Sequence, residues 1–335
     1  MPQSIDVVVP TFNRWDLTEA CLGDLAGQTV EHAVIVSDDG STDGTPARVR
    51  EAFPVASVVE ADRNRGFAAA CNRGVAAGSG RFVVLLNNDV RARPDFLERL
   101  VAPLDRDERV GAVAALLIRP DGETIDSVGL AADATYAGFP RLAGRPVAEA
   151  ASERPALAGP SGGAAAYRRA AWQELGGLDE TMVFYLEDLD LALRLRAAGW
   201  KAVAAPDAVA IHLGSATAGS RTAPTRFNSG FSRAYLLRSY GVLGTRFAPR
   251  AVATETLVAL ADLALSRDAS AARGRLAGWR AASDAQPRPQ PPPEAVERRI
   301  GFVESLRLRW QDVAGHGPRT HGDTPQSSHA PSAPS

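Results

Sequence analysis

Blocks of hydrophobic residues alternate with mixed segments through the first third of the chain. The continuous aliphatic blocks are short and bounded by polar turns, which is typical of strands buried on both faces; they lie at residues 5–10, 33–37, 55–60, 81–86 and 110–118. The segments between them repeat apolar residues at helical spacing, at residues 17–26, 45–52, 66–77 and 95–104. This alternation predicts an α/β fold with a mostly parallel central sheet and flanking helices, whose ligands bind at the carboxyl ends of the strands.

The pattern changes after Pro120. Gly, Ala and Pro become frequent, which predicts a hairpin and a long loop, and later segments regain periodicity. These give helices at residues 167–175 and 187–198, a strand at 202–213, helices through 225–280, a Pro-rich extended linker at 286–293 and a last helix at 294–313. We therefore expect a main domain at residues 1–220, a helical extension at 221–313, and a tail at 314–335 with the composition of a disordered chain.

Charge and cysteine content narrow the class of protein. The formal net charge is -2 and the pI is about 6.2, so no overall charge imbalance favours nucleic acid as a partner. Cys21 and Cys71 lie in apolar stretches, which favours buried thiols over a disulfide or a metal pair and indicates a cytosolic chain. Residues 1–9 lack the basic start of a secretory signal, and the longest apolar stretch, residues 251–265, is interrupted by two acids. These features predict a soluble or, at most, peripheral protein.

Acidic and amide side chains follow two of the predicted strands. Asp38 and Asp39 precede Gly40, and carboxylates there can bind a nucleoside through ring N–H groups or ribose hydroxyls, although a turn that caps the next helix uses the same residues. Asn88 and Asp89 end the strand at residues 81–86. Mg²⁺ or Mn²⁺ that bridges a diphosphate takes one or two protein carboxylates. Asp89 fits that cation, with Asn88 offering its amide to a ribose or a bound water; a strand-end turn is the alternative.

Two further candidates lie in the second half of the main domain. The acids that open the helix at 187–198 suit the positive end of its dipole. At 100° per residue Glu187 and Asp190 share one face, whereas Asp188 points with the apolar side chains, which is costly unless that carboxylate serves a site. His212 ends the strand at 202–213, and alone it would be read as a rim residue.

Taken together, these motifs resemble the family-2 glycosyltransferases with the GT-A fold, and among them the rhamnosyltransferase-like enzymes of bacterial cell-wall and polysaccharide synthesis. The resemblance extends over about residues 4–245 and rests on the following motifs: Val9-Pro10-Thr11-Phe12-Asn13-Arg14, Ser37-Asp38-Asp39-Gly40-Ser41-Thr42-Asp43, Asn64-Arg65-Gly66-Phe67-Ala68, Asn72-Arg73-Gly74, Leu86-Asn87-Asn88-Asp89, Gly176-Gly177-Leu178-Asp179-Glu180, Tyr185-Leu186-Glu187-Asp188-Leu189-Asp190-Leu191, the stretch Arg194 to Trp200, His212 with Gly214-Ser215, Arg233-Ala234-Tyr235, and Tyr240-Gly241.

The resemblance implies a role for each motif. Asp188 would be the general base, and Asp89 and His212 would hold a divalent cation, Mg²⁺ or Mn²⁺. Asp39 would contact the nucleobase. The other donor-binding residues would be Pro10, Thr11, Asn13, Asn64, Gly66 and Asn88, and the acceptor-binding residues would be Gly162, Gly163 and Glu187. Many relatives carry acid-X-acid where this chain has Asn87-Asn88-Asp89, so Asp89 is the one unambiguous carboxylate ligand of that motif.

The implied reaction is an inverting transfer of a sugar from a nucleotide diphosphate to the hydroxyl of a glycan or lipid-linked acceptor. By resemblance the preferred donor is dTDP-rhamnose, with UDP-sugars such as UDP-GlcNAc or UDP-galactofuranose as the alternative. A nucleotidyltransferase would favour a Gly-rich phosphate loop after the first strand, and residues 10–14 contain no glycine. A non-catalytic sugar-nucleotide-binding module would not need all four of Asp39, Asp89, Asp188 and His212.

The helical extension adds a candidate surface for the acceptor. Between Arg221 and Arg280 ten Arg stand against three acids. Such a surface could bind the phosphates of a lipid-linked acceptor or an anionic membrane, which would make the protein peripheral at the inner face of the plasma membrane. An ordinary solvated helix face explains the same pattern, so both interpretations stay open.

Overall fold

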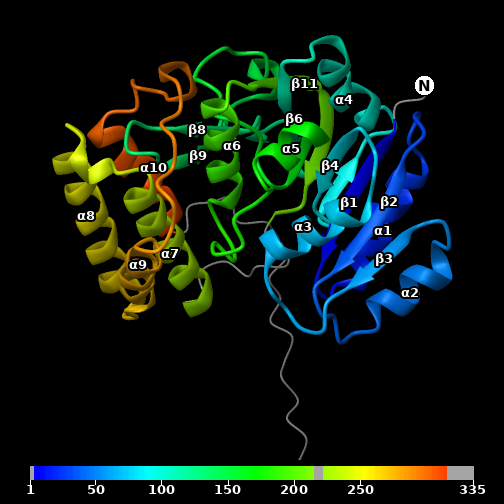
Figure 1. Ribbon diagram of the computed structural model, residues 1–335, viewed down its shortest axis with the longest axis horizontal. Coiled ribbons are helices and arrows are strands. Elements are labelled where there is room, and N and C mark those ends of the chain that lie inside the picture. Colours follow the sequence, from blue (N-terminus) through cyan, green and yellow to red (C-terminus); the bar gives the residue numbers. More distant parts are fainter. Residues whose placement is uncertain (1–3, 215–221, 315–335) are drawn as a thin grey trace, which may run out of the picture.

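The protein, described by a computed structural model over residues 4–214 and 222–314, is built on one large mixed sheet (Figure 1). Within the described residues this sheet has nine strands in the order β3-β2-β1-β4-β10-β6-β11-β5, with β7 beside β6, and β8 pairs with β9 in a separate hairpin. The strands are β1 (Ile5–Thr11), β2 (Ala33–Asp38), β3 (Ser57–Glu60), β4 (Phe82–Leu86), β5 (Val90–Ala92), β6 (Val110–Ile118), β7 (Ile125–Ser127), β8 (Leu130–Ala132), β9 (Gly138–Pro140), β10 (Ala164–Arg168) and β11 (Lys201–His212).

Helices cover both faces of the sheet and form a separate group at the carboxyl-terminal end of the described chain (Figure 1). They are α1 (Trp15–Ala26), α2 (Thr45–Ala52), α3 (Phe67–Ala77), α4 (Phe96–Arg106), α5 (Arg169–Glu174), α6 (Glu187–Ala197), α7 (Ala223–Ser239), α8 (Ala248–Ser266), α9 (Ser270–Ala281) and α10 (Phe302–Ala314). The helix predicted at 294–313 therefore begins eight residues later, at Phe302, and the predicted tail falls almost wholly on residues 315–335, outside the described part.

Most strands of the sheet run in one direction. β1, β2, β3 and β4 are mutually parallel, and β6 and β11 share their direction through the antiparallel strand β10, which lies between β4 and β6. The short strands β5 and β7 run the opposite way. The predicted α/β architecture with a mostly parallel sheet is confirmed, and the carboxyl ends of β1, β2 and β4 lie at the same edge.

Strand β10 was not predicted, and the helix expected at 167–175 was wrong at its start. Tyr167 lies in the strand, and the helix α5 occupies only Arg169–Glu174. The run of Ala164, Ala165 and Ala166 has high helical propensity. Here both neighbouring strands bond to it and all five strand residues are buried, so burial in the middle of the sheet overrides local preference.

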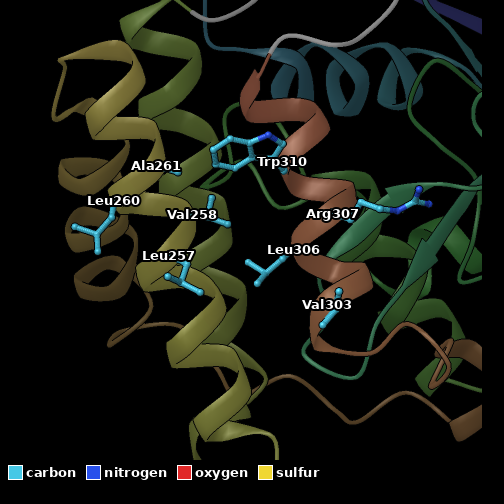
Figure 2. Close-up of a pocket in the computed structure, with 8 residues that line it drawn as sticks. All are labelled: Leu257, Val258, Leu260, Ala261, Val303, Leu306, Arg307 and Trp310. Atoms are coloured by element: carbon cyan, nitrogen blue, oxygen red, sulfur yellow. The ribbon is translucent and has the colours of Figure 1, made fainter.

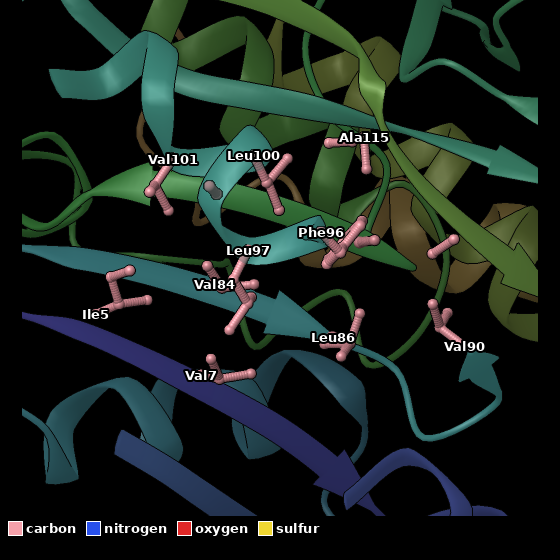
Figure 3. Close-up of a cluster of buried hydrophobic side chains, with 14 of the residues drawn as sticks. Ile5, Val7, Val84, Leu86, Val90, Phe96, Leu97, Leu100, Val101 and Ala115 are labelled. Carbon is pink, nitrogen blue, oxygen red and sulfur yellow. The ribbon is translucent and has the colours of Figure 1, made fainter. Parts of the chain in front are cut away.

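The core is divided by the sheet into two layers. Val7, Val84 and Leu86 point to one face, where Phe96, Leu97 and Leu100 of α4 cover them (Figure 3). Val8, Val83 and Leu85 alternate to the other face and pack under α3, α5 and α6. Because side chains of a strand alternate between faces, strands covered on both sides must be apolar throughout, which explains their continuous aliphatic sequence.

The carboxyl-terminal helices pack tightly on one another. A Cβ on Gly274 of α9 would lie 2.0 Å from the carbonyl oxygen of Phe227 in α7, and one on Gly278 would lie 2.0 Å from that of Phe231. Only glycine permits such a close approach of two backbones. Glu255 of α8 then accepts hydrogen bonds from arginines of the three other helices: Arg233 of α7, Arg275 of α9 and Arg309 of α10.

These helices lie against the main domain, and so does the segment predicted as a linker. Arg250 of α8 pairs with the buried Asp133 at 2.6 Å, and Tyr235 of α7 donates to Asp179. In the Pro-rich segment Arg288 donates its backbone N–H to Ser239 and its guanidinium to Asp179. Among the described helices, none combines the length and apolarity needed to cross a membrane.

Candidate active site

The turn after β2 contains the first predicted carboxylates, and the two differ in what they bind. Asp38 accepts hydrogen bonds from the backbone N–H groups of Gly40 and Ser41, as a turn-capping residue does. Asp39 instead reaches across to the next loop, where Oδ2 accepts from the N–H groups of Arg65 (2.8 Å) and Gly66 (2.7 Å). The carboxylate of Asp39 is thus held at the end of β2 by a loop that was predicted to bind the donor.

The turn after β1 is joined to the turn after β2. Asn13 has a left-handed backbone conformation with φ 56°, donates its N–H to Ser41 Oγ at 2.6 Å and accepts from the N–H of Thr42. Thr11 Oγ1 lies 2.9 Å from Thr18 Oγ1, and Asn88 donates its amide to both hydroxyls. Asn88 is buried, so its amide nitrogen stabilises this turn; its predicted contact with a ribose or water remains a prediction.

Asp89 and His212 lie side by side, because β5 and β11 pair directly after Asp89. The Nε2 atom of His212 is 3.5 Å from Asp89 Oδ2. Two ligands that each approach a small divalent cation at about 2.1 Å can be separated by this distance, so the pair fits one cation. Within residues 4–214 and 222–314 no group of three or more His, Cys, Asp or Glu side chains has the arrangement of a metal site. Diphosphate oxygens and water are further ligands that such a cation accepts.

The sequence did not reveal a third side chain of this site, which contacts His212 from its other ring nitrogen. Asp126 of β7 lies with Oδ2 at 2.8 Å from His212 Nδ1. Burial alone would lower the pKa of His212, but its hydrogen bonds with Asp126 and Asp89 raise that pKa to about 10. A carboxylate on Nδ1 directs Nε2 toward a cation, which would take the place of the Nε2 proton. Nothing in the local sequence of Asp126 marks it, because its role follows from the pairing of β7 with β6.

The predicted base Asp188 lies at the start of α6 and is held by backbone groups. Its Oδ2 accepts from the N–H of Gly162 at 2.8 Å, and its Oδ1 accepts from the N–H of Leu189 at 2.7 Å. Burial raises the pKa of Asp188, and the backbone donors act against that rise. Tyr185 and Leu186, with φ 74° and 67°, form the left-handed turn that places Asp188 beside Gly162.

The neighbouring Glu187 is more deeply buried than Asp188, which corrects the assignment of helix faces. The spacing had placed Asp188 with the apolar side chains and Glu187 with Asp190 on the polar side. In the structure α6 is covered almost all round, so Asp190 is fully buried in an ion pair with Arg194, whereas Asp188 is half-buried. Burial and the charge of Asp188 raise the pKa of Glu187 well above its ordinary value, so the structure favours the protonated form of Glu187.

Hydrogen bonds to backbone groups connect the predicted base, Asp188, to the segment that contains Asp89. Gly162 donates to Asp188, and the carbonyl of the next residue, Gly163, accepts from the N–H of Asn87 at 2.9 Å. Asn87 is two residues before Asp89. The Asp39 loop reaches the same region, because Phe67 donates its N–H to the carbonyl of Val183, just before the turn into α6. Asp39, Asp89, Asp188 and His212 are therefore brought to one edge of the sheet.

Comparison with known proteins identifies this arrangement. The model of the family "Glycosyl transferase family 2" matches residues 6–176, half of the chain. The chain belongs to glycosyl transferase family 2. This glycosyltransferase is 30% identical over 236 residues to the N-acetylglucosaminyl-diphospho-decaprenol L-rhamnosyltransferase of Mycobacterium tuberculosis, a match that covers 63% of this chain and 76% of the relative. It is also 33% identical to the succinoglycan biosynthesis protein ExoO of Rhizobium meliloti over 144 residues, 41% of this chain and 40% of that one.

Solved structures confirm the GT-A fold of this glycosyltransferase. The mannosyltransferase PcManGT of Pyrobaculum calidifontis, in complex with GDP-Man and Mn²⁺, superposes with a TM-score of 0.55 at 23% identity, over 94% of this chain and 86% of that one. GalNAc-T7 with UDP, GalNAc and Mn²⁺ superposes with a TM-score of 0.54 at 15% identity, over 75% and 51% of the two chains. Family membership sets aside the nucleotidyltransferase and the non-catalytic module, and the reaction typical of the family inverts the anomeric centre.

Proposed function

We propose that this glycosyltransferase transfers rhamnose from dTDP-rhamnose to the hydroxyl of a lipid-linked, GlcNAc-bearing acceptor in cell-wall or polysaccharide synthesis. The observation that supports it most is the 30% identity to a relative whose name specifies an L-rhamnosyl transfer to N-acetylglucosaminyl-diphospho-decaprenol. A lipid-linked acceptor also implies that the reaction takes place at the inner face of the plasma membrane, with the protein peripheral to it.

In the proposed mechanism Asp188 accepts the proton of the acceptor hydroxyl while that oxygen forms a bond to the anomeric carbon. The bond from the anomeric carbon to the nucleoside diphosphate breaks in the same step, with inversion. Gly162 and Leu189, which donate to the Asp188 carboxylate, keep it oriented toward the acceptor. A divalent cation held by Asp89 and His212 would supply positive charge to the diphosphate as it departs.

The donor side of the proposal assigns the nucleotide to the linked turns after β1 and β2. Asp39 would accept from the nucleobase, and Pro10, Thr11, Asn13, Asn64, Gly66 and Asn88 would surround base, ribose and diphosphate. Gly40 (φ 82°) is required in this region because a Cβ there would lie 2.7 Å from the backbone of Arg63. On the acceptor side, a Cβ on Gly162 would lie 3.1 Å from the ring of Phe67 and 3.5 Å from Asp188 Oδ2, so the missing side chain lets this backbone lie close to Asp188. Gly162 and Gly163 would contact the acceptor there, and Glu187 would support the acceptor indirectly, through the position of α6.

The test is a panel of nucleotide sugars offered to the purified protein with Mg²⁺ or Mn²⁺. We expect dTDP-rhamnose to give the largest thermal shift and, with a polyprenyl-diphosphate GlcNAc acceptor, to give product. Product from UDP-GlcNAc or UDP-galactofuranose in its place would contradict the proposed donor and support the UDP-sugar alternative. Activity that survives EDTA would contradict the role of a cation at Asp89 and His212.

A further inference from the structure

The surface of the helical extension has an unusual distribution of apolar side chains. Among the described residues twelve large hydrophobic side chains are exposed, and most lie on three helices: five on α8, one on α9 and three on α10. Leu260 is 57% exposed, Val303 77% and Trp310 52%. Apolar patches of this kind on a soluble protein usually mark an interaction site. We name the part of it formed by Val252, Leu257, Leu260, Leu263, Val303 and Trp310 the α8–α10 face.

Helix α8 exposes apolar side chains and buries polar ones, which is the reverse of an ordinary surface helix. Its buried positions are Ala251, Thr254 and Asp262, while Val252, Leu260 and Leu263 lie on the outer side. A surface helix normally buries its apolar stripe and exposes its charges. Figure 1 shows α8 at the outer edge of the molecule, with no described element beyond it. Among the described residues, none therefore covers the apolar side chains on the outer side of α8.

A groove of about 630 Å³ separates α8 from α10 and continues the same face (Figure 2). Leu257, Val258 and Ala261 line it from α8, and Leu306 and Trp310 line it from α10. The ring of Trp310 lies across the groove toward α8, whereas the side chain of Arg307, which also lines the groove, extends away from α8 (Figure 2). An indole at the rim of an apolar surface is typical of proteins that sit at a membrane–water boundary.

The charges around this face are positive. Arg246, Arg267, Arg273 and Arg280 are exposed at or near the ends of α8 and along α9, and in the described part of the chain none of them forms an ion pair. On α8 and α10, within the described side chains, the acids are turned inward or paired: Glu255 and Asp262 face the interior, and Glu304, with 44% of its side chain exposed, pairs with Arg307. Asp268, between α8 and α9, pairs with Arg226. The other basic residues of the extension, such as Arg226, Arg233 and Arg250, are neutralised inside the protein.

We infer that the α8–α10 face docks the protein on an anionic phospholipid bilayer, with Leu260, Leu263 and Val303 entering the acyl boundary and the exposed arginines contacting lipid phosphates. A bilayer supplies an apolar layer beneath a negatively charged one, which matches the face. A second copy of the chain would bring the same arginines of two protomers together, and like charges repel. The inference rests on the part of the proposed function that places the reaction at the membrane, and it assigns the surface that docks there; it does not depend on which sugar is transferred.

The experiment is sedimentation of the full chain with sucrose-loaded vesicles. We expect the protein to pellet with vesicles of phosphatidylglycerol and phosphatidylcholine in equal amounts, to pellet less in high salt, and to stay in solution with phosphatidylcholine alone. The double variant Leu260→Gln/Val303→Gln should reduce the bound fraction at least about tenfold, because each side chain loses its apolar transfer into the bilayer. The matched control is Val55→Gln, since Val55 is 93% exposed on the main domain and should leave pelleting unchanged.

A second pair of variants tests the charge. Arg267→Glu/Arg273→Glu should weaken pelleting with the anionic vesicles, while Arg106→Glu, at the exposed end of α4, should not. Donor hydrolysis and thermal melting of all variants should equal those of the wild type, which separates loss of docking from misfolding and from failure of the proposed reaction. Absence of pelleting by the wild type, or equal pelleting of the Leu260→Gln/Val303→Gln variant, would overturn the inference. So would a wild-type dimer in light scattering that this variant converts to monomer without any vesicle binding.

Discussion

The α/β domain and the helical extension place their charges in opposite ways. In the domain, β1 and β4 bury aliphatic side chains on both faces, and carboxylates such as Asp39 and Asp89 gather where the strands end. In the extension, Glu255 is enclosed by arginines with 12% of its side chain exposed, and Leu260 of the same helix faces outward. The core of the first region is a hydrophobic one, and that of the second is partly an ionic network that joins four helices.

This difference in the placement of charged and apolar side chains indicates that the two regions bind different kinds of partner. Strand ends offer a fixed set of backbone and carboxylate groups to a polar ligand, and the sheet behind them needs no partner. The extension exposes apolar side chains that the packing of its own helices does not bury. Four changes can break or sharpen this comparison.

The largest expected effect is that of Asp188→Asn on turnover. Asparagine can still accept the N–H of Gly162 but cannot take a proton from the acceptor, so kcat should fall by about 10² to 10⁴. Donor affinity, measured by calorimetry, should stay within about twofold, because the donor residues are untouched. Wild-type kcat in the variant would exclude Asp188 as the base.

The second effect is on stability and lies in the extension. Glu255→Gln removes the carboxylate that Arg233, Arg275 and Arg309 share, and should lower the free energy of unfolding in urea by about 3–5 kcal/mol. The matched control is Glu304→Gln on α10, whose pair with Arg307 is at the surface and should contribute less than about 1 kcal/mol. Equal effects of the two substitutions would mean that the ionic core of the extension is not what holds its helices.

The sequence predicted the domain well because its signals are local. The helix predicted at 45–52 has the observed bounds of α2, and five of the six predicted strands match the structure within a residue at each end. What it missed depends on tertiary pairing. Ala164–Arg168 becomes a strand only because β4 and β6 flank it, and β5 has only three residues.

The residues of the candidate site could be predicted because most of them directly follow a strand. The side chains that contact them could not be predicted from the sequence. Asp126 contacts His212 across 86 positions, through a strand pair that no local pattern indicates. Helical spacing also failed to rank Glu187 and Asp188 by burial, since that argument assumes one solvated side and α6 has almost none. Likewise the basic composition of the extension could not reveal that acids of the main domain, such as Asp133 and Asp179, bind several of its arginines.

The third change tests that missed partner. Asp126→Asn keeps the shape but removes the charge behind His212 Nδ1, so the affinity for Mn²⁺ should fall about 10- to 100-fold. Titration of Mn²⁺ followed by electron paramagnetic resonance measures this without turnover. Asp121→Asn, in the exposed turn just before β7, serves as the control and should leave the affinity unchanged. Unaltered Mn²⁺ binding in Asp126→Asn would show that Asp126 does not position His212.

The smallest effect is expected from Glu187→Gln. It is an effect on the free energy of unfolding, and it depends on pH. Because the pKa of Glu187 is raised in the folded protein, folding favours its protonated form, and the stability it provides is complete below the ordinary value of 4.5 and is lost as the pH rises toward the folded pKa. Glutamine cannot ionise, so the variant should match the wild type near pH 4.5 and become the more stable of the two as the pH rises. Urea unfolding at several pH values measures the gap. A wild type that stays equal to the variant, or becomes the more stable of the two as the pH rises, would mean that folding does not raise the pKa of Glu187.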